Sequence, residues 1–272
     1  MGSLVGAVGM SHILASRSLA EEQAERVFAG LKETGTRASG EQADVILFIV
    51  CDHMANFGTD LEAPFTVGVS EHYTSLGDMD LPRMPVAGAP EFARALVASL
   101  AEQGFDLAVT TEIRPDHGLM IPRLFVDPAG QTPIVPLNIN MNMSPVPAPQ
   151  RCWNVGRAVG RFIAGRPQGE RVAIVATGGL SHWIMRPEMG RVNAAFDLKC
   201  LETIAGGDAI SLSSLSAEVI EREAGNGGLE LVTWLCMAGA VYPAGGEVVF
   251  YEPMEAWLTG LGGIVMHIGD KQ

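Results

Sequence analysis

The stretch Ala43–Cys51, ADVILFIVC, decides the fold, because it is a nearly unbroken run of β-branched and other apolar residues. A strand with one buried face alternates apolar and polar residues, whereas a strand covered on both faces reads as a continuous apolar run. We therefore expect Ala43–Cys51 to lie inside a sheet that carries helices on both sides. The run is far too short to cross a bilayer.

Shorter apolar runs and amphipathic stretches alternate on both sides of this strand. Further strands are predicted at Leu4–Gly9, Asp106–Thr111, Pro133–Asn138, Arg171–Ala176 and Glu247–Tyr251. Helices are predicted at Leu19–Leu31 (behind a Ser18/Glu21 capping box), Pro90–Glu102, Arg151–Ala164, Pro187–Thr203 and Leu229–Ala240. This alternation is typical of an α/β fold, with a central mixed or mostly parallel sheet flanked by helices. Because the pattern continues beyond the proline-rich segment 144–149, we expect residues 1–272 to form a single catalytic domain.

Composition and charge narrow the class of protein. The chain has 272 residues, of which 47% are hydrophobic, as in a folded globular protein. Its net charge of −13 repels phosphate backbones, so nucleic acid is not an expected partner. The N-terminus lacks the basic start and apolar stretch of a signal peptide, and we expect a cytoplasmic protein without membrane contact. The four cysteines form no C-x-x-C pair and are expected to be reduced and buried.

Four of the six histidines follow predicted strands. They are His12 in GMSH, His53 in CDH, His117 in RPDHG and His182 in TGGLSH. A lone histidine beside a strand is more often a structural residue than a ligand. In open α/β sheets, however, the loops at the carboxyl ends of the strands converge on one crevice. The four histidines together therefore predict a shared site.

Glu230, in GGLELVTW, is the candidate carboxylate of that site. An acid at the start of a helix is usually explained by the helix dipole. Because Leu229 and Leu231 flank Glu230, we expect it to be drawn inward, where a buried carboxylate needs a cation. Two histidines and one carboxylate suit Fe(II) enzymes that bind O₂ and substrate together, although the same ligands also bind zinc.

The motifs GMSH, an apolar strand ending in DH, DHG, TGGLSH and G-x-E-L-V-x-W occur in this order between about Val5 and Ile264. In this order and spacing they resemble the class III extradiol ring-cleavage dioxygenases. The resemblance implies a non-haem Fe(II) enzyme that cleaves a catecholic aromatic with O₂ and gives a hydroxymuconic semialdehyde type of product. It also implies a homo-oligomer and leaves open a small lid subunit, the ring substituent, and proximal against distal cleavage.

Carried over by motif, the resemblance implies that His12, His53 and Glu230 hold Fe(II). His182 matches the acid/base histidine of the family, and His117 matches a second active-site histidine that acts on bound substrate or oxygen.

Asp52 and Ser181 stand next to His53 and His182, and both are candidates for supporting residues that orient these imidazoles.

Two other functions use the same residues. A zinc metallohydrolase would employ the same His/His/Glu set, and a non-catalytic metal-binding protein could retain the fold. The additional His117 and His182 favour the dioxygenase, since catechol deprotonation and O–O cleavage both need an acid/base group. A serine hydrolase at Ser181 is disfavoured, because the G-x-S-x-G motif is absent.

Overall fold

The structure is a computed structural model that describes residues 2–58 and 63–268. An eight-stranded sheet has the strand order β6-β3-β7-β2-β8-β1-β10-β9, and β4 and β5 form a separate pair. The strands are β1 (Ser3–Met10), β2 (Val45–Val50), β3 (Phe65–Gly68), β4 (His72–Thr74), β5 (Pro85–Ala87), β6 (Ala108–Thr110), β7 (Ile134–Ile139), β8 (Arg171–Thr177), β9 (Gly246–Met254) and β10 (Thr259–Met266).

The four central strands β7, β2, β8 and β1 run parallel to one another. At one side β3 pairs antiparallel with β7, and at the other side β10 pairs antiparallel with β1 and with β9. The predicted mixed, mostly parallel sheet is therefore confirmed. Because β2, β8 and β1 are neighbours, the loops that leave their carboxyl ends meet at one place.

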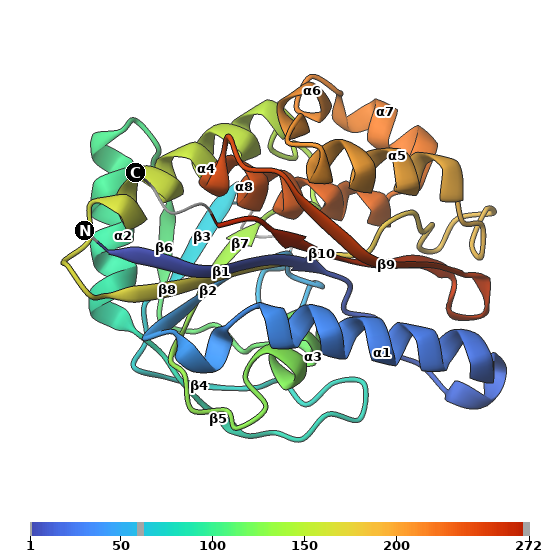
Figure 1. The fold of residues 1–272 in the computed structure, drawn as a ribbon, viewed down its shortest axis with the longest axis horizontal. Coiled ribbons are helices and arrows are strands. Elements are labelled where there is room, and N and C mark those ends of the chain that lie inside the picture. The colour runs from blue at the N-terminus through green and yellow to red at the C-terminus, as the bar shows by residue number, and fades with distance from the viewer. Residues whose placement is uncertain (1, 59–62, 269–272) are drawn as a thin grey trace.

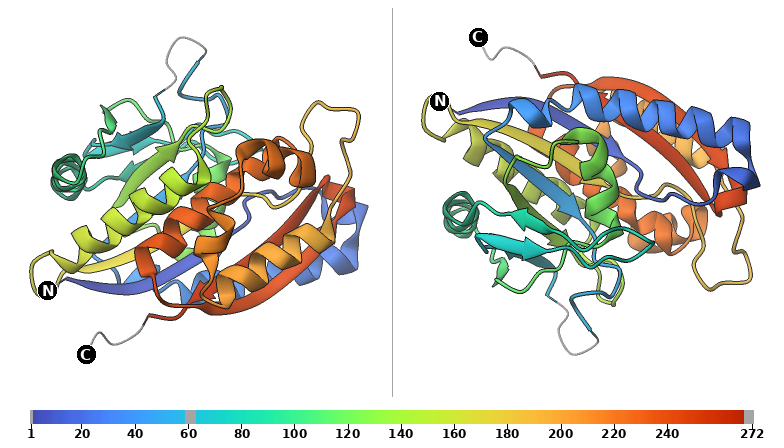
Figure 2. Two further views of the ribbon diagram at one scale, coloured as in Figure 1. Left: turned by 90° about the horizontal axis from the view of Figure 1, so that it is seen from above. Right: turned by 90° about the horizontal axis from the view of Figure 1, so that it is seen from below.

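Helices cover both faces of the sheet, as Figures 1 and 2 show. One face carries α2 (Pro90–Glu102), α4 (Pro149–Ala164), α5 (Ala194–Ala205), α6 (Ala209–Leu212), α7 (Ala217–Ala224) and α8 (Leu231–Val241). The other carries α1 (Glu21–Arg37), α3 (His117–Val126) and the β4–β5 pair. Short 3-10 turns lie at η1 (Arg17–Leu19), η2 (Gly40–Gln42), η3 (Gly227–Glu230) and η4 (Glu255–Trp257).

The side chains of β2 divide between two hydrophobic clusters. Val45, Leu47 and Ile49 pack with residues of α2, α4 and α8. Ile46, Phe48 and Val50 pack on the opposite face, with residues of α1 and α3. All six are buried. The prediction that this strand is covered on both faces is confirmed.

Helix α8 is buried on all sides, between α4 and the sheet. Glycines on α4 allow the two helices to approach closely. A Cβ added at Gly156 would lie 1.9 Å from the backbone oxygen of Cys236, and one added at Gly160 would lie 2.2 Å from that of Ala240. Backbone atoms cannot yield as the end of a side chain can, so these positions require glycine. This close packing fixes the position of α8 relative to the sheet. It thereby also fixes the position of Glu230, which immediately precedes α8.

Two predicted helix starts are wrong. The Ser18 side chain bonds Ser16, and α1 begins at Glu21 without a side-chain cap, so the capping box does not form. The helix predicted from Pro187 begins only at Ala194, because Asn193 caps it there by accepting a hydrogen bond from the Phe196 amide.

Strands β3, β4, β5 and β10 and helices α3, α6 and α7 were not predicted. The glycines of TGLGGIVM obscure the strand pattern of β10, and Pro122 lies inside α3, where proline normally argues against a helix.

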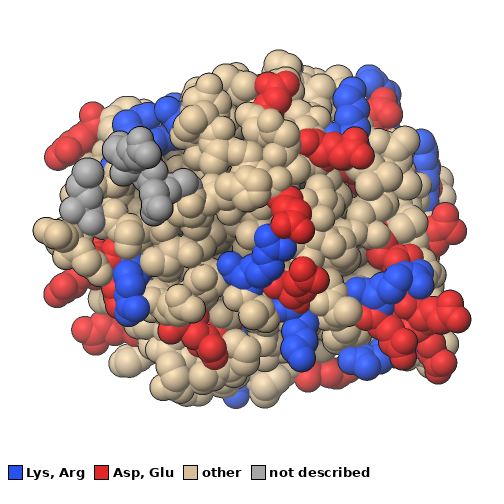
Figure 3. Space-filling view, viewed as in Figure 1, with Lys and Arg blue, Asp and Glu red and all other residues tan. Residues whose placement is uncertain are grey.

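On the face seen in Figure 3, lysines and arginines are intermixed with acidic residues. All four cysteines are buried and unpaired, as predicted.

Among the described residues, no helix combines the length and apolar character needed to span a membrane.

We predict that Gly156→Ala lowers the free energy of unfolding by about 1–3 kcal/mol, because its methyl group has no room against the backbone of α8. The control is Gly165→Ala at the end of α4, where an added Cβ meets its nearest neighbour at an ordinary 3.5 Å. We expect that change to alter stability by less than about 1 kcal/mol. Urea denaturation of both variants checks this. Equal stabilities would contradict the close α4–α8 packing.

Candidate functional site

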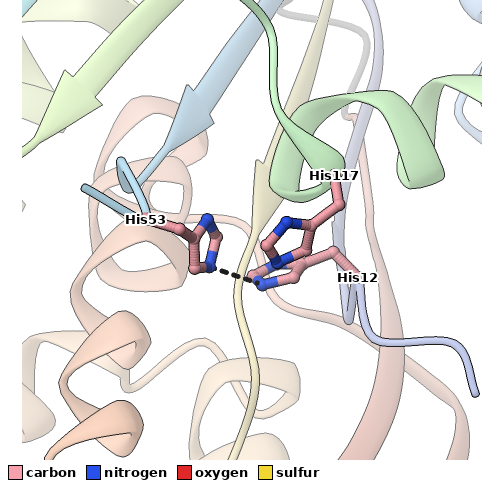
Figure 4. Close-up of side chains that lie close together, drawn as sticks. All are labelled: His12, His53 and His117. Atoms are coloured by element: carbon pink, nitrogen blue, oxygen red, sulfur yellow. Dashed lines mark hydrogen bonds between the residues drawn. The ribbon is translucent and has the colours of Figure 1, made fainter. Parts of the chain in front are cut away.

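His12 and His53 leave the sheet from strands that flank β8. His12 comes shortly after β1 and is fully buried, and His53 comes shortly after β2 and is partly exposed. Their Nε2 atoms lie 3.1 Å apart (Figure 4). The expectation that these two histidines meet at the carboxyl edge of the sheet is confirmed.

Glu230 reaches the same place from the end of η3, immediately before α8. Its Oε2 lies 3.7 Å from His12 Nε2, and its Oε1 lies 3.3 Å from His53 Nε2. The Gly179 amide donates a hydrogen bond to Oε2. A Cβ added at Gly178 would lie 2.9 Å from the Glu230 Cβ, so the glycines of TGGLSH let the carboxylate approach the end of β8.

His117 joins these residues by a different route from the one expected. The preceding strand β6 is parallel to β3, which is antiparallel to β7, so β6 runs against the central strands. Its carboxyl end therefore points away from the site, and segment 111–116 returns the chain to the start of α3. There the ring centroid of His117 lies 4.1 Å from that of His53 and 5.5 Å from that of His12 (Figure 4).

His182 follows β8 and borders Glu230 across Gly179. A Cβ added at Gly179 would lie 2.7 Å from His182 Cε1 and 3.3 Å from Glu230 Oε2. On its other side the ring packs on Gly227, where a Cβ would lie 2.0 Å from His182 Nε2. His182 is buried, and both glycines are needed to leave space for its ring.

Three of the four imidazoles are fixed in the same tautomer. His53 Nδ1 lies 3.0 Å from Asp116 Oδ2, His117 Nδ1 lies 2.5 Å from Asp78 Oδ2, and His182 Nδ1 lies 2.9 Å from the carbonyl oxygen of Leu180. Carboxylates and carbonyls accept hydrogen bonds, so each Nδ1 carries the proton. When the rings are neutral, each Nε2 keeps a lone pair for a metal ion or a substrate proton.

The spacing of His12, His53 and Glu230 fits one metal ion. Two ligand atoms at right angles, each about 2.1 Å from a metal, lie about 3.0 Å apart. The three closest contacts among these side chains are 3.1, 3.3 and 3.7 Å. Two groups of three residues, His12/His53/His117 and Cys51/His53/Glu230, each bring one potential ligand atom per residue within 4.8 Å of one another. The side chains could therefore hold a metal ion, with His12 and His53 offering imidazole nitrogens and Glu230 a carboxylate oxygen.

The electrostatics agree with this ligand set. Burial lowers the pKa of His12 to about 3, so its imidazole is neutral. Burial alone would raise the pKa of Glu230, but His12, His53 and His182 outweigh it and hold this pKa well below its ordinary value. Burial, with the nearby Glu230, raises the pKa of Cys51 to about 12. Cys51 is thus a thiol that donates to Glu230 Oε1 at 3.0 Å.

His53 carries the strongest interactions with acids. Burial disfavours its imidazolium, but the hydrogen bonds with Asp116 and Glu230 outweigh burial and raise the pKa of His53 above its ordinary value. In turn, burial would raise the pKa of Asp116, but the hydrogen bond with His53 outweighs burial and lowers that pKa. A metal ion at Nε2 would take the place of the proton that His53 otherwise holds between these carboxylates.

The structure corrects the predicted role of Asp52. Asp52 does not orient His53, because its carboxylate accepts hydrogen bonds from the backbone of Asn56 and Phe57 and so shapes the loop. Asp116 orients His53 instead. Asp116 adjoins His117 in the sequence but lies 63 positions from His53, and no sequence pattern links that pair.

Ser181 acts on the chain rather than on a ring. Its hydroxyl donates to Asp197 Oδ2 at 2.7 Å and its amide donates to Asp197 Oδ1 at 2.9 Å, while the Asn193 amide donates to the Ser181 hydroxyl. Tyr251 also donates to Asp197, which is buried. Ser181 therefore stabilises the turn that carries His182. It does not contact the imidazole, so the predicted contact is absent. Neither Asp78 nor Asp197 was predicted as a site residue. Asp197 belongs to no motif, and Asp78 ends the segment FTVGVSEHYTSLGD, which resembles the family but contains none of the five motifs that predict the site.

Comparisons with known proteins agree with this geometry. Residues 6–262 match the family model described as the catalytic LigB subunit of aromatic ring-opening dioxygenase. The chain is 26% identical to a 2,3-dihydroxyphenylpropionate/2,3-dihydroxicinnamic acid 1,2-dioxygenase of Photorhabdus laumondii subsp. laumondii, over 89% of both proteins. It is 32% identical to a gallate dioxygenase of Pseudomonas putida, over 60% of this chain and 48% of that protein.

A crystal structure of an uncharacterized protein from Escherichia coli K12 has the same fold, with a TM-score of 0.60 and 16% identity, and covers 97% of this chain and all of that one. The family model spans the glycines, histidines and glutamate that build the site. The chain therefore belongs to the LigB family of aromatic ring-opening dioxygenases, the class III extradiol enzymes that its motifs resemble.

Proposed function

We propose that the protein is an Fe(II)-dependent enzyme that opens a catecholic ring by extradiol cleavage with O₂. The observation that carries this proposal is the convergence of His12, His53 and Glu230, whose ligand atoms approach within 3.1 to 3.7 Å, beside the imidazoles of His117 and His182. Two histidines and a carboxylate on one side of a metal leave positions open for substrate and O₂. The dioxygenase names of the relatives support the same reaction class.

His182 is proposed to take a proton from a ring hydroxyl. Its Nδ1–H is held by the Leu180 carbonyl, so Nε2 is the nitrogen that accepts the proton. His117 is proposed to supply or hold a second proton at its own Nε2 during oxygen insertion. Imidazole suits both roles, since it exchanges protons near neutral pH. Burial of His182 and Glu230 limits the access of water to the proton transfers.

The overall reaction breaks one ring carbon–carbon bond next to the diol and adds both atoms of O₂ to the product. The product is of the hydroxymuconic semialdehyde type, and no external reductant is consumed. When bound, Fe(II) would supply the open positions at which diol and O₂ are activated together. His12, His53 and Glu230 would hold it, with Asp116 fixing the ring of His53.

Zinc is the alternative metal, because the same ligands bind it in hydrolases. Membership of a ring-opening dioxygenase family and the two additional imidazoles favour iron. Assembly as a homo-oligomer, with or without a small lid subunit, stays a prediction, as does the cytoplasmic location. Sedimentation analysis of the purified chain addresses the first of these.

We predict that the protein loaded anaerobically with Fe(II) consumes one O₂ per catechol cleaved and forms a yellow product. An oxygen electrode with absorbance scans, over protocatechuate, gallate, catechol, 2-aminophenol and 2,3-dihydroxyphenylpropionate, identifies the preferred ring. His182→Ala should lower kcat by about 10²–10⁴-fold, because proton transfer from the ring loses its acceptor. Glu230→Ala should abolish turnover by removing a ligand.

Metal analysis of the same preparations is the control. Iron that supports turnover, with zinc that does not, is the expected pattern. If the iron-loaded chain binds metal tightly and consumes no O₂ with any catechol of the panel, the proposed reaction is wrong for this chain acting alone.

We also predict that Asp116→Asn weakens Fe(II) binding by about 10- to 100-fold, since the His53 imidazole loses the carboxylate that orients it. Asparagine can still cap α3 as Asp116 does through the Gly118 amide, so the fold should persist. Anaerobic competition with a coloured chelator measures the affinity. The matched control is Asp52→Asn, which changes a neighbouring carboxylate away from the rings. Equal affinities for both variants would show that Asp116 does not support the metal site.

A further inference from the structure

We propose that Asp78 is a positioning residue that fixes the tautomer and orientation of His117. This inference rests on the proposed function, because it concerns how His117 is presented to the substrate. Asp78 belongs to the loop between β4 and β5, far from His117 in sequence, and it lies in none of the motifs that indicate the site.

The carboxylate holds His117 at two points. Asp78 Oδ2 lies 2.5 Å from His117 Nδ1 and accepts a second hydrogen bond, at 3.3 Å, from the His117 backbone amide. The Leu76 amide also donates to the Pro115 carbonyl at 2.8 Å, which joins the two loops at the level of the backbone. Three contacts thus tie the 76–78 segment to the start of α3. Free rotation of the His117 ring would break the shortest of them.

The turn around Asp78 has an uncommon backbone. Gly77, Met79 and Asp80 all have positive φ angles, of 76°, 48° and 60°. This conformation suits glycine and is tolerated by aspartate, but it is unfavourable for methionine. Such strain tends to persist at functional sites, where the surrounding structure holds it in place. The strained turn presents the Asp78 carboxylate to His117.

The second oxygen of Asp78 supports the same interpretation. Asp78 Oδ1 is buried and has no hydrogen-bond partner in the described part of the chain. An unpaired buried acceptor is unfavourable, so the carboxylate is not placed here to complete the hydrogen bonding of its own loop. Its paired oxygen is directed at His117 alone.

The contact between Asp78 and His117 Nδ1 determines whether the other ring nitrogen, Nε2, carries a proton. Because Nδ1 carries the proton, the neutral ring presents an unprotonated Nε2, and the potential ligand atoms of His117, His12 and His53 lie within 4.8 Å of one another. Without Asp78 the ring would be free to turn and to adopt the Nε2–H tautomer that histidine favours in water. The lone pair would then be lost from the site.

The test compares Asp78→Ala, Asp78→Asn and the control Asp80→Asn. Asp80 carries the same charge on the same turn but is exposed, and asparagine tolerates its backbone conformation. Asp78→Asn keeps an acceptor oxygen and serves if the alanine variant does not fold. Circular dichroism and Fe(II) affinity establish that each variant retains its fold and its metal site.

The first readout is independent of activity. Long-range ¹H–¹⁵N spectra of the metal-free, imidazole-labelled protein, at a pH where ordinary imidazoles are neutral, report which nitrogen is protonated. The His117 signals are assigned from their loss in His117→Gln. We expect Nδ1–H in the native protein and in Asp80→Asn, and a shift toward Nε2–H in Asp78→Ala. Asp78→Asn should fall between them.

The second readout is kinetic. With Fe(II) and the preferred catechol, Asp78→Ala should lower kcat by about tenfold or more while KM and metal affinity stay within about threefold. An unchanged His117 tautomer in both Asp78 variants, with kcat within about threefold of native, would overturn the proposal. If the native chain cleaves no catechol, the proposed function fails and the spectra alone decide the role of Asp78.

Discussion

The buried carboxylate of Glu230 is the constraint on which the rest of the structure depends. It lies where the loops from β1, β2 and β8 meet, and a charge at that depth is tolerated only with strong partners. The protein supplies the Gly179 amide, the Cys51 thiol and two imidazoles. Gly156 and Gly160 allow α8 to pack closely on α4, and Gly178 and Gly179 leave room at the end of β8. Both pairs of glycines position the Glu230 side chain.

Around that carboxylate, each imidazole is held either by a hydrogen bond at its Nδ1 atom or by complete burial. Asp116, Asp78 and the Leu180 carbonyl each hold an Nδ1–H, and His12 is fully buried. The potential ligand atoms of His12, His53 and His117 lie within 4.8 Å of one another, so these three imidazoles share one space. Such preorganisation suits a centre that must bind metal, deprotonate a diol and return a proton without rearranging.

Much of this could be predicted from local sequence patterns. The apolar run of β2 indicated a strand covered on both faces, and the motifs identified His12, His53 and Glu230, which the structure brings together. Relations between distant segments could not be predicted. The reversed direction of β6 changes how His117 arrives, and the Asp116–His53 and Asp78–His117 contacts depend on loops whose paths leave no periodic signal. Adjacency in sequence misled in the case of Asp52.

The measurement that tests the central claim most directly is a crystal structure of the protein loaded anaerobically with Fe(II), with anomalous difference maps from both sides of the iron absorption edge. One iron peak per chain is predicted, about 2.0–2.2 Å from Nε2 of His12, Nε2 of His53 and a carboxylate oxygen of Glu230. Neither His117 nor His182 should be a ligand. An iron peak held by His117 in place of Glu230, or iron bound elsewhere in the molecule, would contradict the account.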